Sequence, residues 1–118
     1  MWFSRFPETI ILAAVAIIAA VVVTVFPARA DCLEELGCTD KDYFVRQQVE
    51  AIACEELWHL RNRIYDDNGY CFKSRRGQDA FSNDGCQYDA DADVPLNEVE
   101  QANVTLIAEV ETANGCKY

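Results

Sequence analysis

The sequence predicts a small, mainly α-helical domain stapled by disulfides, with two antiparallel helices at about 41–67 and 97–113 joined by a long loop. Three observations predict this fold class. Apolar residues recur at gaps of three and four in both stretches, which is the spacing of an amphipathic helix. Six cysteines lie in a chain of only 118 residues, all of them after an apolar N-terminal segment. Gly, Asp, Asn and Ser are frequent between the two helical stretches.

The N-terminal segment is interpreted as an export signal that forms a signal or anchor helix. Residues 10–26 carry no charge, and Pro27 and the small-residue sequence Ala-Arg-Ala at 28–30 follow, which is typical of a signal peptide and its cleavage site. As a helix the apolar run would span roughly 26 Å, close to the ~30 Å core of a bilayer, so an uncleaved anchor in the inner membrane is the alternative. Residues 1–30 are therefore predicted to be a signal peptide or N-terminal membrane anchor, and residues 31–118 a periplasmic or extracellular domain.

The first helix of the domain is predicted over about 41–67. Thr39 followed by Asp42 has the form of a capping box at its start, and no Pro or Gly interrupts the stretch. Asn68-Gly69 is predicted to end it, since glycine readily adopts the left-handed conformation that follows a helix. A break near 51–53 is an alternative that the pattern leaves open. The apolar positions at helical spacing are Val45, Val49, Ile52, Leu57, Leu60 and Ile64.

The second helix is predicted over about 97–113. Asn97 is expected to cap its first turn, with Glu100 three residues later, and Asn114-Gly115 is expected to end it. The apolar face consists of Val99, Ala102, Leu106, Ile107 and Val110. Between the two helices, a short helical turn around residues 78–81 is the only regular structure we expect.

The cysteines are predicted to form three disulfides, because an even number of cysteines in a small exported chain is typical of a disulfide framework. Cys54 lies roughly 21 Å from the end of the first helix, which is too far for a bond to Cys71 because the two Cα atoms of a disulfide lie within about 7 Å. If the second helix runs back along the first, its end lies beside Cys54. The pairs favoured by this geometry are Cys54–Cys116, then Cys71–Cys86 across the loop and Cys32–Cys38 at the start of the domain.

Charge and composition exclude several function classes. The net charge of −10 at pH 7 argues against nucleic acid and anionic membrane surfaces as partners, so contact with a membrane is expected only through residues 10–26 if they are uncleaved. The basic residues Lys73, Arg75 and Arg76 are expected to be solvated, with contact to an anionic wall polymer as the alternative. No cofactor and no zinc site are expected, because the sequence has no Cys-x-x-Cys and His59 is its only histidine.

Two polar groups in the first helix are candidate sites, and for each we prefer a structural interpretation. Arg61 and Asn62 have the character of a ligand-binding pair. A buried arginine is tolerated only when it is paired, so Arg61 is expected to pair with Glu100 of the second helix and Asn62 to bond the loop backbone. His59 has no nucleophile pattern around it, so no catalytic residue is predicted.

Residues 89–100 reproduce the ligand spacing of an EF-hand calcium loop without its glycine. Val94 stands where the loop needs a glycine, and Pro95 after it favours an extended backbone. We therefore expect an acidic turn that leads into the second helix, and no metal site.

Two separated motifs carry a resemblance to a known family. The first reads Leu57-x3-Arg61-Asn62-x-Ile64-Tyr65-x3-Gly69-x2-Phe72, and the second reads Leu96-x3-Glu100-x2-Asn103-x3-Ile107. Together they resemble the YARHG domain, a bacterial extracytoplasmic module, over about residues 50–112. The chain departs from that family at 66–68, where Asp-Asp-Asn stands in place of Ala-Arg-His. The resemblance implies location and fold, and it implies no reaction.

The sequence therefore predicts an exported, YARHG-like domain of the cell envelope that is not an enzyme. Its expected role is that of a structural or binding module, with an unidentified envelope component or secreted protein as its partner. The acidic charge suggests an alternative, a small inhibitor of a basic secreted enzyme. A hydrolase that uses His59 is the least favoured interpretation.

Overall fold

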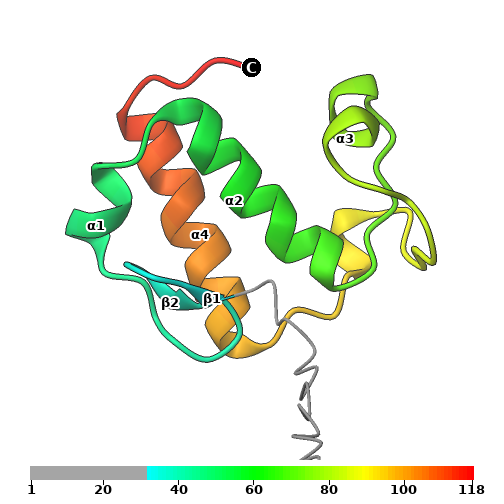
Figure 1. Cartoon of the computed structure of the whole chain (residues 1–118), viewed down its shortest axis with the longest axis horizontal. Coiled ribbons are helices and arrows are strands. Elements are labelled where there is room, and N and C mark those ends of the chain that lie inside the picture. The colour runs from blue at the N-terminus through cyan, green and yellow to red at the C-terminus, as the bar shows by residue number, and fades with distance from the viewer. Residues whose placement is uncertain (1–31) are drawn as a thin grey trace, which may run out of the picture.

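The computed structural model describes residues 32–118, which are arranged around two long helices (Figure 1). The helices α2 (Cys54–Asp67) and α4 (Glu98–Ala113) pack against each other, and the short helix α1 (Arg46–Glu50) packs on α4. The other elements are the strands β1 (Cys32–Leu33) and β2 (Gly37–Cys38), the helix α3 (Arg75–Ala80) and the 3₁₀ helix η1 (Asp91–Asp93). The mainly helical, disulfide-stapled class is confirmed, with four α-helices in the described part of the chain instead of two.

The helices α2 and α4 run antiparallel, and contacts at both ends fix their register. The Cys54–Cys116 disulfide joins the start of α2 to the end of α4. At the other end, the side-chain amide of Asn68, which follows α2, donates to the carboxylate of Glu100 in the first turn of α4. The helix pairing that the sequence predicts is therefore present.

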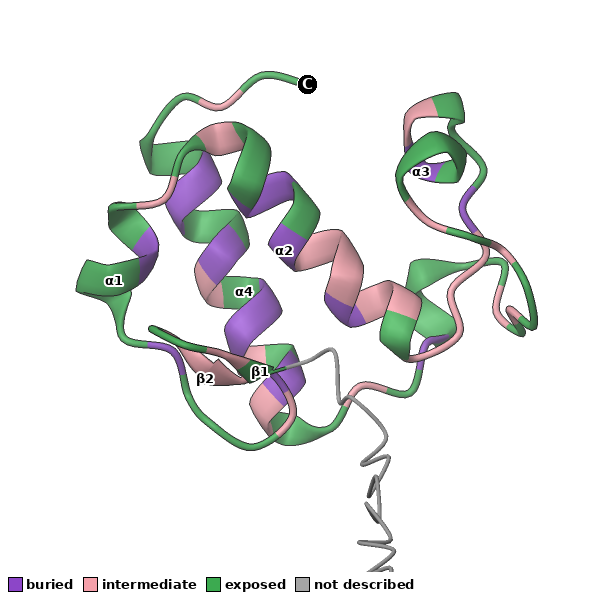
Figure 2. Ribbon diagram, viewed as in Figure 1, coloured by how far each residue is buried: buried purple, intermediate pink, exposed green. Residues whose placement is uncertain are grey.

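The hydrophobic core lies where α1, α2 and α4 face one another (Figure 2). Leu57 and Ile64 of α2, Ile107 and Val110 of α4, and Val49 of α1 are each 0% exposed. The three-and-four spacing of these residues places them on the facing sides of their helices. Full burial of such a side chain is worth roughly 1.5–3 kcal/mol relative to its exposure, so this interface stabilises the helix pair.

The predicted helix over 41–67 is in fact two helices. α1 ends at Glu50, and Ala53 has an extended backbone (φ −67°, ψ 152°) as the residue that precedes α2. The break falls at 51–53 and turns α1 away from the line of α2 (Figure 1). This turn buries Val49 in the core while Val45 stays 56% exposed. Tertiary packing therefore overrides the local helical pattern.

The capping box predicted at Thr39 and Asp42 is also wrong, because these residues belong to the turn between the β1–β2 hairpin and α1. β1 and β2 pair antiparallel, with Cys32 opposite Cys38. The carboxylate of Asp42 accepts a hydrogen bond from the backbone N–H of Cys38 at 2.8 Å, and Thr39 is buried. Asp42 thus fixes the end of the hairpin instead of a helix start.

The boundaries of α4 agree with the sequence prediction. The side-chain oxygen of Asn97 accepts from the backbone N–H of Glu100 at 2.8 Å, and the Glu100 carboxylate accepts from the backbone N–H of Asn97 at 3.1 Å. This reciprocal pair is a capping box. Gly115 follows the end of α4 with φ +64°, and Gly69 follows α2 with φ +91°. Both glycines have the left-handed conformation that the sequence predicts.

Residues 70–95 form a lobe beside α2 that contains α3 and η1. The predicted helical turn around 78–81 lies partly within α3, which Ser74 caps by accepting from the Gly77 N–H at 3.0 Å. The Asn83 side chain bonds both the N–H and the carbonyl of Phe72, at 2.8 and 2.9 Å. The Cys71–Cys86 disulfide closes the same loop. These bonds order a connection that is long for a compact domain.

All six cysteines are bonded, and the pairs are those that we expect from the sequence: Cys32–Cys38, Cys54–Cys116 and Cys71–Cys86. Within residues 32–118, no helix has the length and apolar character needed to cross a bilayer. The apolar segment 10–26 and the expected cleavage after residue 30 lie outside the described residues.

Candidate functional site

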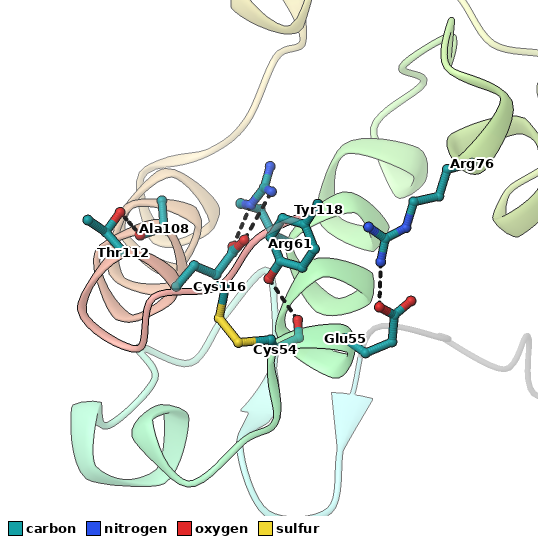
Figure 3. Close-up of a disulfide and its surroundings, with 9 residues drawn as sticks. Cys54, Glu55, Arg61, Arg76, Ala108, Thr112, Cys116 and Tyr118 are labelled. Atoms are coloured by element: carbon teal, nitrogen blue, oxygen red, sulfur yellow. Dashed lines mark hydrogen bonds and ion pairs between the residues drawn. A yellow bond between two sulfur atoms is a disulfide. The ribbon is translucent and has the colours of Figure 1, made fainter.

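Arg61 of α2 forms an ion pair with Glu111 of α4 (Figure 3). Its Nε and Nη2 donate to the two carboxylate oxygens of Glu111 at 2.6 and 3.2 Å. Glu111 is buried, and its hydrogen bond raises the pKa of Arg61, so the guanidinium stays charged. The prediction that Arg61 pairs with Glu100 is wrong, because the antiparallel register brings the last turn of α4 level with Arg61.

Glu100 joins the two helices at the opposite end. It is buried, and its carboxylate accepts from the side-chain amide of Asn68 and from the backbone of Asn97. Asn62 does not bond the loop backbone as predicted. Its amide donates to the carbonyl of Trp58 in its own helix at 2.8 Å. These polar residues of the two motifs therefore make contacts within the scaffold.

Asn103 attaches the N-terminal segment to α4. This side chain is 1% exposed, and its oxygen accepts from the Phe44 N–H at 2.9 Å. Its amide donates to the carbonyls of Thr39 and Asp42 at 3.1 and 2.9 Å. A buried amide with its bonds satisfied fixes the backbone that it contacts. Asn103 therefore holds residues 39–44 against the helix pair.

The remaining motif residues lie in or beside the core. Leu57, Ile64, Ile107 and Phe72 are buried, and Tyr65 and Leu96 are partly buried against the core. At Gly69, an added side chain would have a strained backbone and would lie 3.4 Å from the Tyr88 ring. The two motifs thus describe the helix interface and the turn that closes α2.

His59 has no catalytic neighbours among the described residues. Its side chain is about half exposed, its Nε2 lies 3.7 Å from a carboxylate oxygen of Glu55, and its ring meets the Trp58 ring edge-on. All six cysteines are bonded in disulfides, so none offers a thiol as a nucleophile. In the acidic run 89–100, Asp91–Asp93 form η1, and residues 32–118 hold no group of three or more His, Cys, Asp or Glu side chains placed to bind a metal ion.

The basic cluster of the loop is divided between two environments. The Arg76 guanidinium donates to Glu55 at 2.6 Å (Figure 3). It also lies 3.9 Å from the Trp58 ring centroid and 4.9 Å from that of Tyr118. Lys73 and Arg75 are exposed. Arg76 therefore attaches α3 to α2 and to the C-terminal residue.

The Tyr118 hydroxyl closes this contact at the C-terminus. It donates to the Cys54 carbonyl at 2.7 Å, next to the Cys54–Cys116 disulfide (Figure 3). Loss of water around the phenol and the nearby Glu111 carboxylate raise the pKa of Tyr118 to about 12, although 53% of the residue is exposed. The phenol is therefore protonated at neutral pH and available as a donor.

A groove of about 750 Å³ lies against α2, on a flank next to the face that packs on α4. Its volume is typical of a ligand-binding site, for which roughly 300–1,000 Å³ is usual. The residues that line it come from the hairpin, from α1 and α2, and from the lobe. The apolar ones are Leu33, Leu36, Ile52, Leu60 and Phe81, and the polar ones are Glu34, Glu35, Gln48, Glu56, His59 and Arg63.

The charged residues of the groove are not used to hold the fold together. Glu34, Glu35, Glu56 and Arg63 make no ion pair within residues 32–118. Glu56 lies in the first turn of α2, where a carboxylate also interacts favourably with the helix dipole. The groove therefore combines an apolar floor with charges that a ligand can use.

Sequence reasoning missed this groove because one of its walls is a hairpin with strands of only two residues. The available signal was the Cys32–Cys38 pair, which closes a short loop around two leucines, Leu33 and Leu36. Apolar residues held in a closed surface loop indicate that the loop packs against another part of the chain or against a ligand.

The comparisons with known proteins identify a family and no individual relative. A family model described as the YARHG domain matches residues 35–112. No curated protein and no solved structure matches the chain. The matched range contains both motifs, the helices α1, α2 and α3, all of α4 except its last residue, and most of the groove.

Proposed function

The chain belongs to the YARHG domain family, extracytoplasmic modules of non-catalytic type and unknown function, and on this premise we propose that it is an exported binding module that recognises its partner through the groove on α2. Its three disulfides indicate an oxidising compartment. We place the domain in the periplasm or outside the cell, with an N-terminal membrane anchor as the alternative to cleavage.

The groove is the observation that carries this proposal. Its apolar floor offers surface that a partner can cover, and its charged residues are free of ion pairs within the described chain. The motif residues Arg61, Glu100 and Asn103 are already occupied by contacts inside the fold. The polar groups of the motifs are therefore already used within the fold, whereas the groove offers a partner both apolar surface and charged side chains.

Catalysis has weaker support than binding. A hydrolase would need a nucleophile or an activated water beside His59, and this half-exposed side chain of the groove contacts only Glu55, Trp58 and Phe81 among the interactions of the described residues. We therefore propose a non-catalytic role. The carboxylates of the groove, which make no ion pair within residues 32–118, favour a small acidic inhibitor of a basic secreted enzyme as the second candidate. An assay of such an enzyme with and without the protein separates the two.

The test uses two neighbouring positions of α1. Gln48 is exposed and lines the groove, whereas Gln47 is exposed and lies outside it. A photo-cross-linking side chain is placed at one or the other position of the full chain, in the cells that produce it. We expect a discrete adduct from position 48 and none from position 47 after illumination. Equal adducts from both positions, or none from position 48, would show that the groove is not the binding surface.

A further inference from the structure

The floor of the groove is apolar, preformed and only partly covered by the chain itself. Leu33, Leu36, Ile52 and Phe81 line it and are each of intermediate exposure. The Cys32–Cys38 disulfide and the bond from the Cys38 N–H to Asp42 hold the hairpin that carries the two leucines. Covering such a surface with another apolar group is favourable, and a rigid wall loses little freedom when a ligand binds.

The charge around this floor is negative. Glu34, Glu35 and Glu56 stand at the groove without an ion pair inside the described chain, against a single guanidinium, that of Arg63. Of the other helix arginines, Arg46 is paired with Glu109 and Glu50, Arg61 with Glu111, and Arg76 with Glu55, whereas the exposed Arg75 does not line the groove. The net charge of the whole chain, −10, has the same sign. A ligand of the groove is therefore expected to carry positive charge.

The shape of the groove suits a peptide segment better than a small cation. Glu56, Leu60 and Arg63 follow one flank of α2 at gaps of four and three, so the groove runs along the helix. The stretch from Glu56 to Arg63 covers roughly 10 Å, or two helical turns. Grooves of this kind bind an amphipathic segment that places apolar anchors on the floor and polar groups at the rim.

We propose that the groove binds a basic, apolar segment of a partner protein, with its apolar side chains on the Leu33–Leu36 and Phe81 floor and its Lys or Arg side chains at Glu34, Glu35 and Glu56. The proposal rests on the binding function above and adds the chemical class of the partner. Arg63 then donates to a carbonyl or carboxylate of the bound segment.

The test titrates two helical probe peptides into the full chain with its disulfides intact. Both peptides have the same leucine face, and their polar positions are all Lys in one and all Glu in the other. We expect the Lys peptide to bind and the Glu peptide to bind at least about tenfold more weakly. Gln48→Trp should fill the groove and abolish binding, whereas Gln47→Trp should leave it unchanged.

A charge-matched pair of variants separates local from overall charge. Replacing Glu34, Glu35 and Glu56 by Gln should weaken binding of the Lys peptide about tenfold. Replacing Asp89, Asp91 and Asp93 by Asn changes the net charge by the same amount on exposed residues that do not line the groove, and it should have an effect of less than about twofold.

The outcomes distinguish this proposal from the proposed function. Equal binding of both peptides, blocked by Gln48→Trp, would overturn the basic class and leave the groove as a binding site. Equal weakening by the two triple variants would overturn it too, because binding would then follow overall charge. If neither peptide binds, the basic segment is wrong, and the cross-linking result at position 48 decides whether the binding function fails with it.

Discussion

The carboxylate of Glu111 is buried at 6% exposure and depends on Arg61 for its pairing. We predict that Arg61→Ala destabilises the domain, because it leaves this carboxylate uncompensated. Breaking a buried pair costs on the order of 3–5 kcal/mol, and the 27% exposure of the Arg61 side chain places the expected cost near the lower end, about 3 kcal/mol. The measurement is denaturant unfolding with the disulfides intact.

Arg63 is the matched control, two residues along the same helix. It lines the groove and makes no ion pair among the described residues, so Arg63→Ala should change the free energy of unfolding by no more than about 0.5 kcal/mol. If the Arg61→Ala and Arg63→Ala proteins unfold alike, Arg61 does not act through stability. Loss of partner binding in Arg61→Ala alone would then make it a binding residue.

At the scale of residues, the sequence predicted which side chain is paired but not its partner. Arg61 crosses the helix interface as expected, yet to Glu111 and not to Glu100. The signal was present in the predicted disulfide. With Cys54 bonded to Cys116, Arg61 stands about 10 Å beyond one cysteine and Glu111 about 8 Å before the other, along antiparallel helices. Glu100 lies in the first turn of α4, at the end away from the disulfide, and accepts a hydrogen bond from Asn68.

At the scale of elements, α3 is attached to α2 by Arg76 and by Phe81 at its end, whose ring lies 6.0 Å from that of Trp58 and 5.9 Å from that of His59. We predict that Arg76→Gln frees α3 locally, because it removes the contacts with Trp58, Tyr118 and Glu55. Hydrogen exchange of the Gln78 and Phe81 amides, which bond inside this helix, should accelerate. Global stability should fall by no more than about 1 kcal/mol, since cation–π and exposed ion pairs contribute about that much.

Arg75→Gln provides the control for this change. Arg75 lies in the same helix, is exposed and makes no ion pair within residues 32–118. Exchange of the Gln78 amide should be the same as in the parent. Equal acceleration in both variants would mean that charge or helix propensity, not the Arg76 contact, protects α3.

Elements whose signals are local were predicted better than those formed by packing. The α4 helix carries its own start and stop in Asn97, Glu100 and Gly115, and its bounds agree with the prediction. The break between α1 and α2 has no Pro or Gly to mark it, because it arises from burial of Val49 against other helices. The hairpin was missed since two-residue strands leave no periodic pattern.

At the scale of the whole molecule, we predict that the disulfides contribute to stability in the order of the loops they close. Cys54–Cys116 links residues 62 apart, and Cys32–Cys38 links residues 6 apart. In the chain-entropy model these loops correspond to about 4 and about 2 kcal/mol. Replacing both cysteines of a pair by Ser and measuring urea unfolding tests the order. A larger loss from the Cys32–Cys38 pair would mean that the hairpin does more for the fold than close a loop.

The groove could not be predicted from the sequence because it exists only after separate parts of the chain meet. The hairpin, the α1–α2 junction and Phe81 each contribute lining residues, and none of these segments has a binding motif of its own. The helix pair and the disulfide pairs were within reach because periodicity and helix length constrain them. The proposed function, which rests on the groove, was therefore the level that the sequence predicted least.

The disulfide between Cys54 and Cys116 also determines how the domain would respond to tension. A force applied at residue 32 and at residue 118 passes through the sulfur bridges and never loads the chain between Cys54 and Cys116. Only the segment from Cys38 to Cys54 and the last residues can be drawn out, to a total of roughly 60 Å when fully stretched, compared with roughly 290 Å for the reduced chain. The helix pair stays tied at one end even in a stretched molecule, so the oxidised domain would act as a short, strong link in an envelope under mechanical load.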